Sequence, residues 1–268
     1  LKSSLNSLAQ RFVDDTKRIA NLDLEVSSVI RLLASLCSKN FVILTGLSGS
    51  GKTKIAQALA RWVCDNRSAY EIVPVGADWT NREEILGYHD GLNPDKYVKK
   101  TSFELILRAG IHPDKPHFLI FDEMNLSHVE RYFSDFLSAI ESGEEILMHE
   151  NPNEVDGVPS RIGMPANLHV LGTVNVDETT YMFSPKVLDR ANVIEFRVSV
   201  DGFTEFLDDP KRIDFDNIAG KGAAYGPAVV SGSQLDIDRA LLDSVSGPLP
   251  DGSNGPCYPA LRMEMEVL

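Results

Sequence analysis

The run at residues 46–53 reads GLSGSGKT, and it constrains the fold of this chain more than any other feature. In such a pattern the glycines let the backbone curl so that successive N–H groups point into one concavity. A short apolar, β-rich run at 41–45 precedes it, and Ile55, Leu59 and Val63 repeat at helical spacing after it. The order of strand, loop and helix predicts a P-loop, which cradles the phosphates of a nucleotide.

Each position of this loop has an expected role. Lys52 would reach the β- and γ-phosphates, and the Thr53 hydroxyl would be a ligand of Mg²⁺. The residues expected to bind nucleotide are Gly46, Leu47, Ser48, Gly49, Ser50, Gly51, Lys52, Thr53 and Lys54. A glycine-rich turn that binds nothing is the alternative, and the flanking strand and helix argue against it.

Short apolar runs alternate with helical stretches along the chain. The expected strands are the runs at 41–45, 70–75, 117–121, 168–172 and 193–196. Helices are expected at 26–37, after the P-loop, and at 127–141, where Ser127 and Glu130 are spaced as a capping box. This alternation predicts an α/β fold with a five-stranded, mainly parallel sheet sandwiched by helices. Ligands of such a fold bind beyond the carboxyl ends of the strands, where the P-loop lies.

The segments on either side of this core differ from it. We expect residues 1–25 to form a polar N-terminal linker helix and residues 26–200 to form the nucleotide-binding core. Residues 201–268 are expected to be a partial or irregular lid, or an insertion. This last segment is rich in glycine and proline and has one clear helical stretch, at 235–245.

Composition restricts the surroundings in which the chain is expected to work. Its net charge of −13 argues against a broad nucleic-acid surface, because Lys and Arg supply nonspecific affinity for phosphates. No apolar run approaches the ~18 residues of a membrane span, and no signal-peptide pattern is present, so we expect a cytoplasmic chain without membrane contact. The widely spaced Cys37, Cys64 and Cys257 are expected to be reduced, buried thiols.

A second motif is the apolar run at 118–121 that ends in the acids Asp122 and Glu123. At the carboxyl edge of a strand, Asp122 would hold Mg²⁺ and Glu123 would polarise the water that attacks the γ-phosphate. The alternative is an acidic turn after a buried strand. Because kinases must exclude water, the second acid favours an enzyme that hydrolyses nucleoside triphosphates.

Two further polar residues follow at the ends of later elements. Asn175 would sense the γ-phosphate and help to orient the water, or else cap a turn. Arg190 lies on a short helix before the last strand and would act as an arginine finger across a subunit boundary, which implies a ring. A surface salt bridge with Asp189 or another acid is the alternative for Arg190.

The motifs GLSGSGKT, FLIFDEMN, GTVNVDET and SPKVLDR together resemble those of AAA+ ATPases. Within that superfamily they look like the McrB-type motor subunits of modification-dependent restriction systems, neighbours of the MoxR and dynein-related branch. The resemblance covers about residues 26–200. It implies Mg²⁺, ATP or GTP as substrate, a homo-oligomeric, hexameric ring, an McrC-type nuclease partner, and DNA bound through other domains or subunits. A MoxR-like, ATP-dependent protein-remodelling chaperone is the alternative.

By position, the resemblance implies roles for six residues in the hydrolysis of the nucleotide. Lys52 and Thr53 would bind phosphate and Mg²⁺, and Asp122 and Glu123 would hold Mg²⁺ and place the water. Asn175 would sense the γ-phosphate, and Arg190 would be the arginine finger. Some positions depart from the family pattern. Val174 stands where the family has Met, and either Asp177 or Glu178 would help to place water.

Two weaker signals lie outside these motifs. Arg262 is a weak candidate for the arginine that a lid helix usually supplies. Lys99 and Lys100 lie where the MoxR-like branch often inserts a hairpin that faces the central pore, so they could contact DNA. A solvated loop is the alternative, because two lysines contribute little in an acidic chain.

Overall fold

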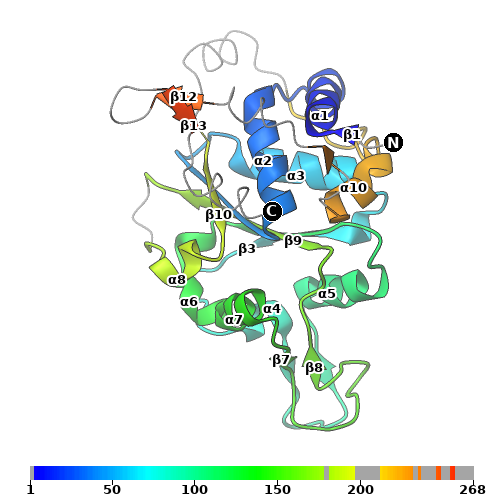
Figure 1. The fold of residues 1–268 in the computed structure, drawn as a ribbon. Helices are drawn as coiled ribbons and strands as arrows, with labels where there is room; N and C mark the ends of the chain where they lie inside the picture. Colours follow the sequence, from blue (N-terminus) through cyan, green and yellow to red (C-terminus); the bar gives the residue numbers. More distant parts are fainter. Residues whose placement is uncertain are drawn as a thin grey trace.

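A five-stranded sheet lies at the centre of the computed structural model, which describes residues 3–177, 181–196, 212–231, 235–236, 246–248 and 254–256 (Figure 1). Its strands are β2 (Phe41–Gly46), β3 (Tyr70–Pro74), β6 (His117–Asp122), β9 (Leu168–Asn175) and β10 (Asn192–Glu195). Their order is β10-β2-β9-β6-β3, and all four pairings are parallel. The predicted α/β fold and its five strands are confirmed.

Helices cover both faces of this sheet (Figure 1). On one face lie α1 (Leu5–Ala20), α2 (Val26–Ser38), α3 (Lys52–Val63) and α10 (Gly226–Ser231). On the other lie α4 (Glu83–Leu86), α5 (Thr101–Ile111), α6 (Val129–Tyr132) and α7 (Ser134–Ser142), with α8 (Pro185–Leu188) before β10. Other short elements are β1 (Ser3–Ser4), β11 (Leu235–Asp236), β12 (Ser246–Pro248), β13 (Asn254–Pro256) and the 3₁₀ turns η1 (Arg67–Ala69), η2 (Met124–Leu126) and η3 (Ala223–Tyr225).

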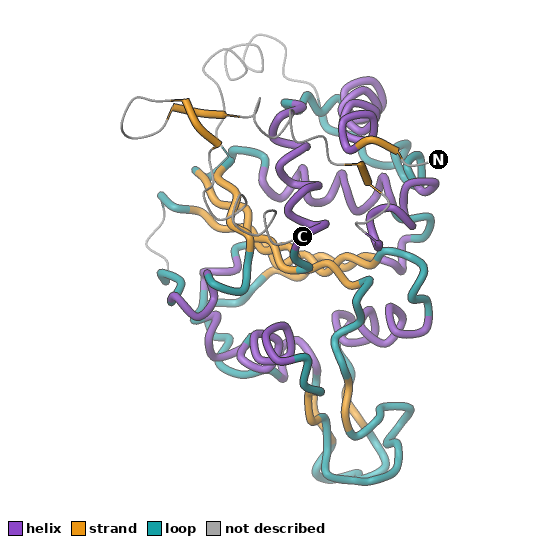
Figure 2. Tube along the Cα trace, in the orientation of Figure 1, coloured by secondary structure: helices purple, strands orange, loops and turns teal. Residues whose placement is uncertain are grey.

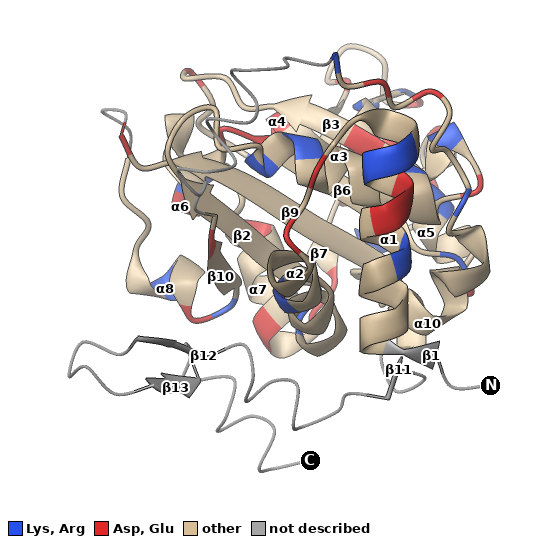
Figure 3. Cartoon of the chain, turned by 90° about the horizontal axis from the view of Figure 1, so that it is seen from above, with Lys and Arg blue, Asp and Glu red and all other residues tan. Residues whose placement is uncertain are grey.

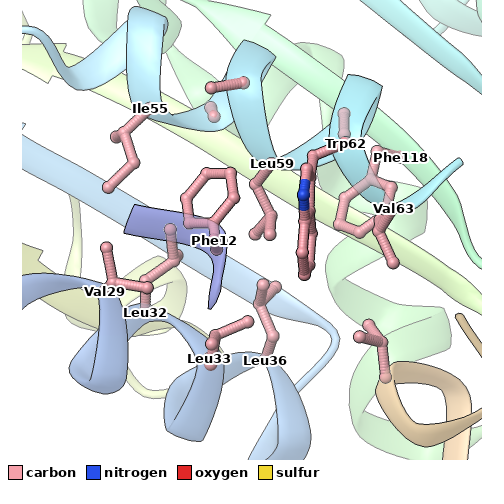
Figure 4. Close-up of a cluster of buried hydrophobic side chains, with 14 of the residues drawn as sticks. Phe12, Val29, Leu32, Leu33, Leu36, Ile55, Leu59, Trp62, Val63 and Phe118 are labelled. Carbon is pink, nitrogen blue, oxygen red and sulfur yellow. The ribbon is translucent and has the colours of Figure 1, made fainter. Parts of the chain in front are cut away.

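The sheet strands are apolar on both faces because both faces are covered. In β2, Val42 and Leu44 belong to the core cluster under α1, α2 and α3, whereas Phe41 and Ile43 belong to the opposite cluster. Figure 4 shows Phe12 of α1 and Trp62 of α3 within the first cluster. Burying a side chain of this size stabilises the fold by about 1.5–3 kcal/mol.

Helix α1 differs from the polar linker helix expected at 1–25. Its apolar side is buried against α2 and α3, and the carboxylate of Asp15, a residue only 1% exposed, accepts a 3.0 Å hydrogen bond from the Trp62 indole N–H. Arg11 and Arg18 pair with the same carboxylate. The polar residues of α1 suggest a linker in the sequence, but the helix packs into the core of the sheet domain and is anchored there.

The helix predicted at 127–141 is divided. Phe133 separates α6 from α7, with φ −109° and ψ 7°. The predicted capping box is wrong, because the Ser127 hydroxyl donates to the Trp79 carbonyl and Glu130 accepts from the backbone N–H of Ser184. These tertiary partners replace the local cap that the spacing suggested.

Two hairpins project from the sheet domain beyond α5 and α7 (Figure 2). One is formed by β4 (Tyr88–His89) and β5 (Tyr97–Val98), and the other by β7 (Ile146–Leu147) and β8 (Arg161–Ile162). A hairpin near Lys99 and Lys100 is what the resemblance to the MoxR-like branch suggests, with a solvated loop as the alternative. Lys99 pairs with Asp156 of the second hairpin, and Lys100 lies 3.5 Å from the Glu84 carboxylate. Both lysines are thus engaged within the chain.

Residues 212–231 pack on the α3 side of the sheet. Phe215 and Ile218 are buried there, and the Tyr225 ring stacks on Trp62 with 5.5 Å between centroids. The division expected at residue 200 stays a prediction. The helix expected at 235–245 is wrong at its start, since Leu235–Asp236 forms strand β11 paired with β1, and residues 237–245 lie outside the described ones.

The described cysteines are free thiols, as expected. Burial raises the pKa of the Cys37 thiol to about 11 and raises that of Cys64 further. Cys257 and Arg262 lie outside the described residues. Among the helices that the structure describes, none combines the length and the apolar character needed to cross a bilayer.

Candidate functional site

The P-loop joins β2 to α3 and takes the curled form that its glycines allow. Gly46 has φ 152°, and a Cβ added there would lie 2.4 Å from the Phe196 carbonyl oxygen. Gly51, at the N-terminus of α3, has φ 88°. Positive φ values of this kind favour glycine, so both conformations explain why these positions carry no side chain.

Lys52 lies inside this curl and is only 4% exposed. Its ammonium donates to the carbonyl oxygens of Gly46 and Leu47, at 2.9 and 2.6 Å, and to the Ser50 hydroxyl at 3.2 Å. The predicted phosphate ligand is therefore positioned by the loop itself. Lys54, also expected to bind nucleotide, has its ammonium 5.8 Å from the centre of the Phe215 ring.

Asp122 ends β6 beside the start of α3. The Thr53 hydroxyl donates to Asp122 Oδ1 at 2.6 Å, and the Thr173 hydroxyl of β9 donates to the same oxygen at 2.8 Å. The two residues predicted to hold Mg²⁺ are thus brought together. Hydroxyl and carboxylate oxygens are the ligands that Mg²⁺ prefers, so this pair fits the ion chemically.

Glu123 follows Asp122 and turns sharply out of the strand. Its backbone adopts the left-handed region, with φ 55° and ψ 49°. Such a conformation is uncommon for a residue other than glycine and costs on the order of 1 kcal/mol or more. The Asn175 amide donates to Glu123 Oε1 at 3.3 Å, and the Glu123 N–H donates to the Thr173 hydroxyl at 3.1 Å. The predicted base and sensor therefore lie in contact at adjacent strand ends.

Residues after β9 connect it to the P-loop. The Val176 N–H donates to the Gly46 carbonyl at 3.2 Å, and Asp177 Oδ1 accepts from the Ser48 N–H at 2.9 Å. Of the two acids considered for water placement, Asp177 is thus bound to the P-loop backbone. Glu178 lies outside the described residues.

Arg190 lies at the other end of the sheet. It precedes the first residue of β10 and lines a pocket with Asn40 and Leu168, whereas the P-loop follows the last residue of β2. Its guanidinium donates to the Leu137 and Lys186 carbonyls and forms an ion pair with Glu141. The alternative of a salt bridge to an acid is observed, although the acid is Glu141 and not Asp189.

Sequence reasoning missed two residues of this site. Thr173 joins Asp122 to Glu123, and the buried Asn125 donates from its amide to the Asn175 carbonyl at 3.4 Å. Thr173 stands two positions before Asn175, so its side chain leaves the same face of β9. That alternation was the signal that could have identified it.

Comparisons with known proteins bear on the family and the fold of this chain. A family model described as the AAA domain of the dynein-related subfamily matches residues 41–191. Among solved structures, the chain is similar to that of a candidate ATPase from Cytophaga hutchinsonii, with a TM-score of 0.54 and 15% identity. That match covers 86% of this chain and 62% of the other, and at this identity it shows the fold alone. A search of curated proteins found no match.

Proposed function

Because the chain belongs to the dynein-related subfamily of AAA domain proteins, we propose that it is a Mg²⁺-dependent enzyme that hydrolyses ATP or GTP. One observation carries this proposal. A hydrogen-bonded series runs from Thr53 to Asp122, on to Thr173 and Glu123, and then to Asn175. It gathers, at the carboxyl ends of β2, β6 and β9, the groups that we propose to hold Mg²⁺ and to activate water.

The side chains of this series divide the work. Lys52 and the P-loop amides bind the phosphates, and Thr53 and Asp122 would hold Mg²⁺. When bound, Mg²⁺ neutralises charge that develops on the phosphate oxygens. Glu123 accepts the proton of the attacking water, and Asn175, which contacts the Glu123 carboxylate, orients that water.

We also propose that a neighbouring subunit of a ring completes each site. Arg190 supports this, because it lies at the amino ends of the strands, away from its own P-loop, so that a nucleotide it contacts would belong to a second subunit. To do so its guanidinium must leave Glu141. An arginine supplied in this way is typically worth about 10³–10⁵ in kcat.

For the larger assembly, our proposal is an McrB-like motor of a DNA restriction complex. The four linked motifs support it, and an McrC-type nuclease partner would follow. DNA would be held through other domains or subunits, because the chain has a net charge of −13. In Figure 3, basic and acidic residues are interspersed along the described chain.

The second candidate function is the remodelling of other proteins by a MoxR-like chaperone. Lys99 and Lys100 favour it, because both form ion pairs within the chain and are therefore not free to bind DNA phosphates. Hydrolysis measured with and without duplex DNA distinguishes the candidates. Stimulation by DNA and recovery of a nuclease subunit with the chain would support the motor, and stimulation by an unfolded polypeptide alone would support remodelling.

Two measurements test the enzyme and the ring. The first compares hydrolysis of Mg-ATP and Mg-GTP while oligomer size is recorded in parallel, and we expect turnover that rises with assembly.

The second measurement mixes the inactive variants Glu123→Gln and Arg190→Ala in equal amounts. Random mixing pairs an intact acid site with an intact arginine at roughly one interface in four, so about a quarter of wild-type turnover should return. Failure of the mixture to regain turnover would contradict the shared site.

A further inference from the structure

Thr173 lies in β9, between the P-loop strand and the strand that carries the acids. Thr173 is 2% exposed and lies opposite Leu44 of the neighbouring strand β2. The hydroxyl donates to Asp122 Oδ1 at 2.8 Å and accepts from the Glu123 backbone N–H at 3.1 Å. One hydroxyl thus contacts both acids of the proposed site.

Packing alone does not require this hydroxyl. A buried position in a central strand favours a β-branched side chain, and Val would fill it with nearly the same shape. Thr carries a polar group that must be satisfied when buried, and here both of its partners belong to the acids. The choice of Thr over Val is therefore explained by the site.

The two contacts restrict the acids in different ways. Asp122 Oδ1 receives hydroxyls from both Thr53 and Thr173, which limits rotation of the carboxyl group. Glu123 has a left-handed backbone at φ 55°, and the Thr173 oxygen satisfies its N–H in that conformation. Without this acceptor, the part-buried N–H would lose its partner and the turn that directs the Glu123 side chain would be less stable.

We propose that Thr173 is a positioning residue that orients Asp122 toward the Mg²⁺ of the bound nucleotide and Glu123 toward the attacking water. This inference rests on the proposed nucleotide hydrolysis. In this role Thr173 contacts the two acids and acts on the nucleotide and the water only through them. Its effect passes through the two acids, so it should change Mg²⁺ dependence and kcat more than nucleotide KM.

The first test compares Thr173→Val with Thr173→Ser in the full chain. Outer partners of metal ligands typically contribute 10–100-fold to metal affinity or activity, so Thr173→Val should lower kcat by at least ~10-fold. The Mg²⁺ concentration for half-maximal turnover should rise by a similar factor, and KM should change less than about threefold. Thr173→Ser keeps the hydroxyl and should restore both values to within about threefold of wild type. Equal kinetics for Thr173→Val and wild type would overturn the proposal.

A second readout does not depend on turnover. The thermal unfolding midpoint is measured with ADP while Mg²⁺ is titrated, and Thr173→Val should need at least ~10-fold more Mg²⁺ for half of the stabilisation. Thr16→Val removes a buried hydroxyl of α1 that donates to the Val13 carbonyl, and it should leave this titration unchanged. If wild type hydrolyses no nucleotide, the proposed function fails while the titration still decides the role of Thr173. Overlapping titrations for Thr173→Val and wild type would refute that role.

Discussion

Thr53 and Asp122 stand 69 positions apart in the sequence, and the Thr53 hydroxyl donates to Asp122 Oδ1 at 2.6 Å. The contact reaches across β9, which lies between the P-loop strand β2 and the Asp122 strand β6 in the sheet. This strand order places Thr173 and Asn175 between the phosphate cradle and the acids. The strand order thus brings together residues that are far apart in the sequence, and the role of each can be tested by substitution.

Replacing Lys52 with Ala should weaken nucleotide binding. Its ammonium lies within the P-loop curl, where it would meet the phosphates. Loss of a hydrogen bond between charged partners costs about 2 kcal/mol, which corresponds to roughly 30-fold in Kd. Isothermal titration with Mg-nucleotide measures the change. Lys115→Ala removes an exposed lysine paired with Asp65 and should leave Kd unchanged; equal affinity in both variants would contradict the assigned role.

Much of the fold and site could be predicted because their signals are local. The P-loop, the apolar strand before Asp122 and Glu123, and the Asn175 strand each lie within a few consecutive residues. Three signals failed where distant partners decide the structure. Ser127 bonds to Trp79, Glu130 bonds to Ser184, and Asp15 anchors a helix that reads as polar.

Asp15→Ala should destabilise the fold without changing the site. The carboxylate loses the Trp62 indole and two arginines as partners, and Trp62 is left with a buried, unsatisfied N–H. Such losses cost about 1–3 kcal/mol in the free energy of unfolding, which urea titration measures. Asp14→Ala removes the adjacent carboxylate, which is exposed and bonds to Gln10, and should change stability by less than about 0.5 kcal/mol. Similar losses for the two variants would show that the Trp62 contact contributes little.

His169 should make stability depend on pH. It is 1% exposed, its ring stacks on Phe118, and neither ring nitrogen has a hydrogen-bond partner among the described residues. Burial, assisted by the nearby charge of His117, lowers the pKa of His169 to about 4 from its usual value of 6.5. The unfolded chain therefore binds the proton first, and stability present above pH 6.5 is lost as pH falls toward 4.

The size of this effect follows from the two pKa values. At pH 5, His169 should lower the free energy of unfolding by about 2 kcal/mol relative to pH 7.5. His169→Leu removes the titrating ring, so its stability should fall by correspondingly less between the two pH values. Urea unfolding of both proteins at each pH gives the comparison. Parallel losses in wild type and His169→Leu would show that another group causes the dependence.

Arg190 illustrates what one chain cannot specify. Its position in the sequence predicts an arginine finger. In the described chain its guanidinium pairs with Glu141 at the amino ends of the strands, away from Lys52. A role for Arg190 in hydrolysis requires a second subunit, and contacts within one subunit do not determine how the second one is placed. The interpretation of Arg190 therefore rests on the mixing experiment with Glu123→Gln.

The most direct test of the proposed enzyme is a paired measurement on Glu123→Gln. Gln keeps the size of the side chain and can still contact Asn175, but it cannot accept a proton from water. We expect the Kd for Mg-nucleotide to stay within about threefold of wild type while kcat falls by about 10²–10⁴. A variant that binds nucleotide and turns it over at the wild-type rate would contradict the account.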